Sequence, residues 1–124
     1  MKYTGTVVTG KAYGRQLGFP TANIVCDTDI ALKSGVYAGW VVIADERPVY
    51  RSGIVVFATG ASVRIEAHLI DFTGDLYGQT ISVYPDVYLR DFETYATEDL
   101  LIAAIAADIE TIKETELCSP ESLK

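Results

Sequence analysis

The sequence is poor in the residues that hold structural metal ions and disulfide frameworks. It contains 2 cysteines, Cys26 and Cys118, which lie far apart and outside any CxxC pair, and 1 histidine, His68. This set is too small for a usual four-ligand zinc site, and it is typical of reduced thiols in a cytosolic protein. We therefore expect neither a disulfide framework nor a structural zinc ion.

Basic residues are also scarce. Lysine and arginine together number 10 against 17 aspartates and glutamates, so the formal net charge is −7. Sequence-independent binding of nucleic acids requires a basic protein surface that displaces counterions. An anionic membrane surface also attracts basic protein segments. We expect no nucleic acid and no membrane as a partner. A local basic pocket for a phosphate is compatible with this net charge.

Long apolar runs are absent. The N-terminal residues, MKYTGTVVTG, lack the apolar core of a signal peptide, and no stretch reaches the ~20 apolar residues of a membrane span. The chain has 124 residues, of which 49% are hydrophobic, and this length suits one domain with its own core. The expectation is a single cytoplasmic domain over residues 1–124, present as a monomer, with a frayed tail at 117–124.

Segments rich in β-branched and aromatic residues make up most of the chain. The clearest is 63–72, where apolar and polar side chains alternate as in a strand with one face in the core. Gly53 is expected at a bulge or bend, and Pro85 is expected to interrupt the last strand. Strands are predicted over 3–9, 21–26, 35–44, 49–59, 63–72 and 80–89.

The hydrophobic pattern changes near residue 96. Thr97 is a favourable N-cap, and two acidic residues follow it in the first turn of a helix. Four isoleucines then recur at spacings of 3, 4 and 3, which forms one apolar stripe: Ile102, Ile105, Ile109 and Ile112. The chain is therefore predicted to be mainly β, a six-stranded closed antiparallel barrel with a C-terminal α-helix packed outside.

The segment GKAYGRQLGFPTAN, residues 10–23, is the first candidate for chemistry. Its glycines allow close approach of the backbone to an anion, and its basic residues add positive charge. Thr21 and Asn23, two residues apart on a strand, offer neutral oxygens on one face that suit Mg²⁺. A glycine-rich and proline-rich barrel turn explains the same residues. The candidate nucleotide-binding residues are Gly10, Lys11, Gly14, Arg15, Gly18, Pro20, Thr21 and Asn23.

Glu66 is the second candidate. It lies in the middle of a predicted strand, on the polar side of the alternation with Arg64 and His68. It suits either a surface ion pair or a general base that takes a proton from a hydroxyl during phosphoryl transfer. Farther along, Arg90 lies among aromatic residues that suit a slot for a planar ring or the seam between the barrel and the helix: Tyr84, Tyr88, Phe92 and Tyr95.

The string GRQLGFPTANI closely resembles the signature of the riboflavin kinase family. The likeness continues in GVYAGWV (35–41), IEAHLIDFTGDLYGQTISV (65–83), LRDF (89–92) and the TEDLL start of the helix. The motifs follow the order of the family and cover nearly the whole chain. The resemblance implies a Greek-key barrel and the phosphorylation of riboflavin to FMN by ATP. It further implies a stand-alone kinase module, without the adenylyltransferase domain of bifunctional relatives.

The resemblance also implies roles for individual residues. The glycine-rich loop surrounds the nucleotide phosphates, and Thr21 and Asn23 bind the Mg²⁺ that bridges them. Glu66 is the base on the terminal hydroxyl of the ribityl chain. The implied flavin-binding residues are Arg90, Phe92, Tyr88 and Tyr95.

Two departures from the family pattern keep other functions open. The stretch RSGIVVFATGAS (51–62) lacks a Pro-Thr pair, and Phe92 stands where a glutamate is expected. The first departure suggests a non-catalytic module that binds a flavin or a nucleotide. The second suggests a kinase for a different small alcohol.

Overall fold

The structure is a computed structural model that describes residues 2–8, 21–26, 32–43, 49–59, 62–72, 74, 76–91 and 93–118. Each predicted strand and the predicted helix are present, with ends shifted by a few residues. No helix among these residues has the length and apolar character to cross a membrane. The elements are β1 (Tyr3–Thr6), β2 (Ala22–Cys26), β3 (Gly35–Ile43), β4 (Val49–Thr59), β5 (Ser62–Leu69), β6 (Thr80–Arg90) and α2 (Glu98–Glu114).

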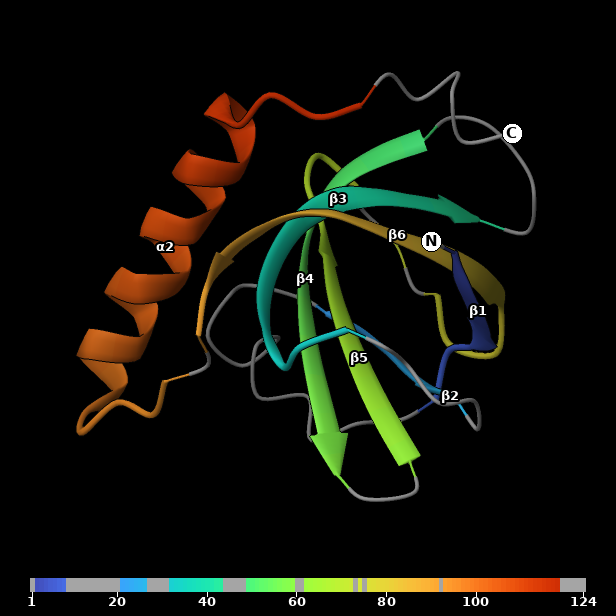
Figure 1. Cartoon of the computed structure of the whole chain (residues 1–124), viewed down its shortest axis with the longest axis horizontal. Coiled ribbons are helices and arrows are strands. Elements are labelled where there is room, and N and C mark those ends of the chain that lie inside the picture. The colour runs from blue at the N-terminus through green and yellow to red at the C-terminus, as the bar shows by residue number, and fades with distance from the viewer. Residues whose placement is uncertain are drawn as a thin grey trace.

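The six strands form one antiparallel sheet in the order β1-β6-β3-β4-β5-β2. The two edge strands of this order approach each other, because the backbone N–H of Val8 donates to the carbonyl oxygen of Asn23 at 2.8 Å. Gly5 of β1 helps this closure, since a Cβ there would lie 3.2 Å from the Cβ of Ile24 on β2. The sheet is thus a nearly closed barrel with α2 beside its wall, as predicted (Figure 1).

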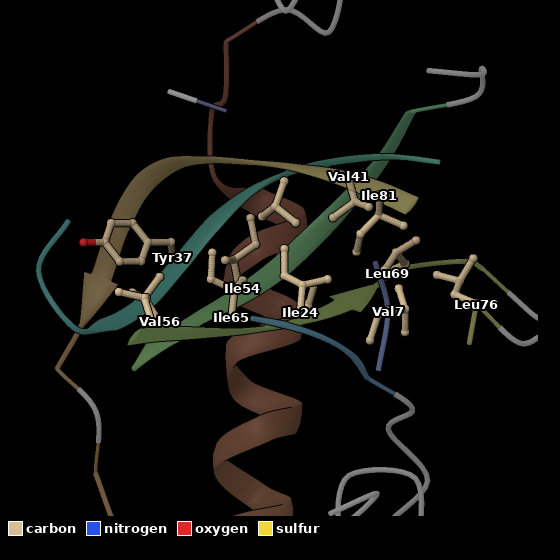
Figure 2. Packing of buried hydrophobic residues seen from close by; sticks show 14 residues of the cluster. Val7, Ile24, Tyr37, Val41, Ile54, Val56, Ile65, Leu69, Leu76 and Ile81 are labelled. Atoms are coloured by element: carbon tan, nitrogen blue, oxygen red, sulfur yellow. The ribbon is translucent and has the colours of Figure 1, made fainter. Parts of the chain in front are cut away.

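The barrel interior follows the period-2 alternation of its strands. On β5, Val63, Ile65, Ala67 and Leu69 are buried, while Arg64 is exposed and Glu66 and His68 are half-buried on the outer face. Figure 2 shows Ile65 beside Ile24 and Ile54 in the middle of the cluster, and all three side chains have 0% exposure. The interior is therefore filled mainly by apolar side chains, and the buried hydroxyl of Ser52 on β4 is paired with the carbonyl oxygen of Tyr50.

Helix α2 lies against the outer face of the wall. Ile112 is the buried residue of the helix and packs with Ala38 of β3 and with Ile70, which follows β5. Gly53 of β4 makes room for this contact, because a Cβ there would lie 2.8 Å from the Cδ1 of Ile112. The registers of β4 are continuous at Gly53, so there is no bulge at this residue, and of the two predicted alternatives only the bend stays a prediction.

Two irregularities of the sheet lie instead between β3 and β6, one between Val36 and Tyr37 and one between Ala38 and Gly39. Gly39 pairs with Pro85, and the preceding Ala38 pairs with Val87, so one residue of β6 is extra at this point. β6 thus runs on to Arg90, and its register is interrupted next to Pro85, where an interruption was predicted. Gly39 is required at this position because a Cβ would collide with the carbonyl oxygen of Tyr84.

Both ends of α2 are capped. The hydroxyl of Thr97 accepts from the N–H of Leu100 at 3.2 Å, as expected for the predicted N-cap. At the other end, Nη1 of Arg51 on β4 donates to the carbonyl oxygens of Ile112 and Thr115 at 2.8 and 2.7 Å. Cationic donors at a helix C-terminus satisfy its unpaired carbonyl groups and oppose its dipole. Arg51 therefore anchors the helix to the barrel.

The chain beyond α2 also contacts the barrel. Leu117 packs with the Ile112 cluster, and the carbonyl oxygen of Cys118 accepts from Nε1 of Trp40 at 2.9 Å. The N–H of Cys118 donates to Asp86 at 2.7 Å, and the same carboxylate raises the pKa of the Cys118 thiol. Cys118 is a free, exposed thiol. The first two residues of the expected frayed tail are therefore docked, and 119–124 lie outside the described residues.

Candidate functional site

A cavity of about 590 Å³ lies between α2 and the outer face of the barrel wall. Its floor is made by outward side chains of the wall, among them Val55, Phe57 and Glu66. Its roof is the inward face of α2, and the segment 93–98 forms a further side. The cavity is thus outside the barrel, between α2 and the outer face of the sheet. Figure 1 shows α2 running along the outside of the barrel.

One row of residues crosses the floor of this cavity from strand to strand. The registers pair Arg90 with Val36, Val36 with Val55, Val55 with Glu66, and Glu66 with Asn23. All five residues line the cavity. Neighbouring strands are about 4.8 Å apart, so Arg90 and Glu66, three strands apart, are separated by roughly 14 Å along the wall. The row therefore has two polar ends and an apolar middle.

Thr21, Asn23, Glu66 and His68 form the first polar end. Asn23 and Glu66 are direct register partners, and opposite residues of an antiparallel pair point to the same face with Cβ atoms about 5 Å apart. Asn23 is buried, and the other three side chains are half-buried. The structure thus brings together the carboxamide and the carboxylate of two adjacent strands and the hydroxyl of the residue that precedes β2.

The other polar end is an ion pair between β6 and α2. Nε and Nη2 of Arg90 donate to the two carboxylate oxygens of Asp108 at 3.0 and 2.7 Å, which is a bidentate arrangement. Nη1 of Arg90 donates to the carbonyl oxygen of Asp91 at 3.0 Å, and the guanidinium lies 6.0 Å from the ring centre of Tyr95. The hydrogen bonds with Asp108 raise the pKa of Arg90, so the guanidinium remains charged.

Apolar side chains of α2 face the middle of the row. Leu101, Ile105, Ile109 and Ile112 line the cavity. The last three belong to the predicted apolar stripe, whereas its first member, Ile102, is not among the residues that line the cavity. The middle of this stripe, at Ile105, therefore borders the cavity, whereas its C-terminal part, at Ile109 and Ile112, also packs on the barrel. Two apolar walls with polar groups at the ends suit a flat, largely apolar ligand.

Asp108 is a site residue that the analysis of the sequence missed. It follows Ile105 by three residues and precedes Ile112 by four, so it falls on the apolar stripe rather than on the solvent face. An acidic residue at such a position needs a partner in the fold, because a buried charge is costly without one. That signal was present in the sequence and indicates a salt bridge under the helix.

The aromatic residues near Arg90 do not form one cluster. Tyr95 lines the cavity, whereas Tyr88 is not among the residues that line it. The ring of Tyr88 packs edge-on against Tyr37 at 5.3 Å between centroids, and Lys33 Nζ lies 4.7 Å above it. Its hydroxyl donates to Asp91, which also pairs with Lys33 at 3.1 Å.

The glycine-rich segment and one aromatic residue lie outside the described residues. They are the candidates Gly10, Lys11, Gly14, Arg15, Gly18, Pro20 and Phe92. Thr21, the residue after this segment, lines the cavity beside Asn23.

The donor set at the first polar end fits a magnesium ion. Neutral oxygens of Thr21 and Asn23 line the same cavity as the carboxylate of Glu66, and hard oxygen donors are what Mg²⁺ prefers when phosphates complete its shell. Within the described part of the chain there is no group of three or more histidine, cysteine, aspartate or glutamate residues placed to hold a metal. The set is thus suited to a metal that arrives with a phosphate ligand.

A family model and full-length relatives identify the family of this chain. The family model Flavokinase, described as riboflavin kinase, matches residues 1–116. The human protein named riboflavin kinase is 33% identical over 129 residues, which covers 97% of this chain and 83% of that protein. The crystal structure of riboflavin kinase from Trypanosoma brucei superposes with a TM-score of 0.71 at 25% identity, covering 91% of this chain and 77% of that one.

Bacterial relatives are longer. The Escherichia coli K12 protein named bifunctional riboflavin kinase/FMN adenylyltransferase is 37% identical over 114 residues. The match covers 90% of this chain, and the chain spans 36% of the length of that relative. The similarity to this protein is therefore confined to about a third of it.

Proposed function

Because this chain belongs to the riboflavin kinase family, we propose that it transfers the γ-phosphoryl group of ATP to the 5′-hydroxyl of riboflavin. The products are FMN and ADP. The observation that carries the proposal is the register pair of Asn23 and Glu66, which joins a candidate metal ligand and a candidate base in one cavity.

Glu66 is the proposed general base. In the reaction the ribityl 5′-oxygen bonds to the γ-phosphorus, the bond from that phosphorus to the β,γ-bridging oxygen breaks, and the hydroxyl proton passes to the Glu66 carboxylate. A half-buried carboxylate on the cavity floor suits this role, since it can contact a hydroxyl directly. Phosphoryl transfer otherwise requires mainly positioning and neutralisation of charge.

Thr21 and Asn23 are the proposed protein ligands of Mg²⁺. When bound with ATP, the ion neutralises phosphate charge. This need is pronounced here, because four carboxylates line the cavity: Glu66, Glu93, Glu98 and Asp108. The guanidinium of Arg90 already pairs with one of them. Gly10, Lys11, Gly14, Arg15, Gly18 and Pro20 remain the proposed surroundings of the nucleotide phosphates.

The apolar middle of the cavity is the proposed site of the flavin ring. Val55 and Phe57 on the barrel wall face Leu101 and Ile105 of α2 across it. Tyr95 and Arg90 line the same cavity and remain proposed flavin contacts, as does Phe92, whereas the position of Tyr88 suits support of the segment after β6. A ring between these walls leaves the ribityl chain to run toward Glu66.

The test is a product assay. The purified protein is incubated with riboflavin, ATP and Mg²⁺, and the flavins are separated by chromatography. FMN that appears in step with ADP is the expected result. Absence of FMN with Mg²⁺, Mn²⁺ or Zn²⁺ overturns the proposal, and quenching of flavin fluorescence without FMN would identify a binding module instead.

A further inference from the structure

The ion pair between Arg90 and Asp108 occupies the end of the cavity away from Glu66. Both side chains are mostly buried, with 28% and 22% of their surface exposed, and both line the cavity. If the ion pair served only to hold the helix, its side chains would not need to line the cavity. The C-terminal end of α2 is already held by Arg51. The location of the pair therefore points to contact with a ligand.

Hydrogen-bonding capacity remains on both members of the pair. A guanidinium has five N–H donors, of which three are used by Asp108 and by the Asp91 carbonyl oxygen in the described part of the chain. Each carboxylate oxygen of Asp108 accepts one of these bonds and can accept another. The pair thus presents donors and an acceptor side by side on the wall of the cavity, with Glu93 also among the lining residues.

The flavin ring system has two unlike edges. One carries two methyl groups, and the other carries the acceptor–donor–acceptor series of a carbonyl, the N3–H and a second carbonyl. The charged pair matches the polar edge, because donors of Arg90 can meet a carbonyl oxygen while Asp108 accepts from N3–H. A buried polar pair that recognises a ligand by hydrogen bonds discriminates strongly against a ligand that lacks one of the hydrogen-bonding groups.

We propose that Asp108 is a specificity-determining residue: it fixes the guanidinium of Arg90 in the cavity and accepts a hydrogen bond from the polar edge of the acceptor's ring. This inference rests on the proposed function, since it assumes a flavin in the cavity. In this proposal the two ends of the row of wall residues have different roles. Glu66 acts on the hydroxyl, and the Arg90–Asp108 pair selects the ring.

The experiment compares riboflavin with 3-methylriboflavin, which lacks the N3–H, in the wild type and in Asp108→Asn. For the wild type, kcat/KM for riboflavin is expected to exceed kcat/KM for 3-methylriboflavin by roughly tenfold or more, which is the effect of one hydrogen bond to a charged group. In Asp108→Asn this ratio is expected to fall toward 1 as the KM for riboflavin rises, with kcat and the KM for ATP within about twofold of the wild type.

Asp99→Asn, on the exposed first turn of the same helix, is the matched control and should retain the wild-type ratio. Arg90→Lys is the second variant if Asp108→Asn does not fold, and it is expected to lower the ratio because lysine lacks the planar fork. A purely structural role would lower thermal stability and weaken both flavins equally. An unchanged ratio in a folded variant, or a wild type that does not distinguish the flavins, overturns the inference.

The two proposals can fail separately. If no FMN forms from any flavin, the proposed function fails, and titration of flavin fluorescence with the same two ligands still tests the ring contact. If FMN forms but the variants keep the preference of the wild type, only the inference on Asp108 fails.

Discussion

Asn23 of β2 and Glu66 of β5 face each other directly across two antiparallel strands, on the outer surface of the barrel. The backbone of Asn23 also accepts the hydrogen bond from Val8 that brings the edges of the sheet together. Closure of the barrel and alignment of the two candidate site residues therefore depend on the same segment. The position of the carboxylate relative to the carboxamide is fixed by the sheet rather than by a loop.

Replacement of the proposed base tests the chemistry at this pair. We expect Glu66→Gln to fold and bind ATP as the wild type does but to lose about 100-fold or more in kcat, because the amide cannot take the proton. The measurement is the initial rate of FMN formation. Glu110→Gln, at an exposed position of α2, is the matched control. Turnover near that of the wild type would remove Glu66 from the proton transfer.

The hydroxyl of Thr21 can be removed with little change of volume. If it binds Mg²⁺, we expect Thr21→Val to raise the Mg²⁺ concentration for half-maximal activity by roughly tenfold, as is usual for weakening a metal site. The apparent KM for riboflavin at saturating Mg²⁺ should stay near that of the wild type. Thr111→Val, on the exposed side of α2, serves as the control. An unchanged Mg²⁺ dependence would argue against Thr21 as a ligand.

Arg51 can be tested as the anchor of α2. Arg51→Met keeps most of the packing on Trp40 but removes both hydrogen bonds to the helix end, so the free energy of unfolding should fall by roughly 2 kcal/mol. Because α2 forms the roof of the cavity, the KM for riboflavin should rise as well. Urea denaturation and steady-state kinetics measure the two effects. Arg64→Met, at an exposed position of β5, is the control and should change neither the free energy of unfolding nor the KM for riboflavin. If Arg64→Met lowers the stability as much as Arg51→Met does, Arg51 has no special role as an anchor.

The exposed cluster of Lys33, Tyr88 and Asp91 predicts a pH dependence of stability. The Tyr88 hydroxyl, with Lys33, holds the pKa of Asp91 below its usual value of 3.8. A carboxyl group with a depressed pKa stabilises the fold above its unfolded pKa, and this contribution is lost as the pH falls through the lower, folded value. The hydrogen bond and ion pair to Asp91 raise the pKa of Lys33, so that contribution is lost only in strongly alkaline solution.

The measurement is the difference in Tm between the wild type and Asp91→Asn as a function of pH. We expect a small positive difference at neutral pH that shrinks once the pH falls below 3.8, the usual pKa of the group. The difference should also shrink in high salt, because the cluster is exposed to solvent. A difference that persists unchanged at pH 3 would show that Asp91 acts through contacts other than its charge.

Much of the fold could be predicted from local patterns. The alternation on β5 correctly separated the buried Val63 and Ile65 from the outward Glu66, since the side chains of a strand have a period of two. Thr97 was correctly identified as an N-cap, because its side chain and the acidic residues after it suit the first turn of a helix. The resemblance in GRQLGFPTANI indicated the riboflavin kinase family, which the comparisons confirm.

The sequence by itself determined which faces are polar, which residue types could carry phosphoryl transfer, and the family. The tertiary structure alone decided the row from Arg90 to Asn23, the salt bridge with Asp108, the separation of Tyr88 from Tyr95 and the docking of Leu117. The physical reason is that periodicity specifies the face of a residue within its own strand or helix. The registers between strands, and the position of a helix on the sheet, are set by packing between residues far apart in the chain.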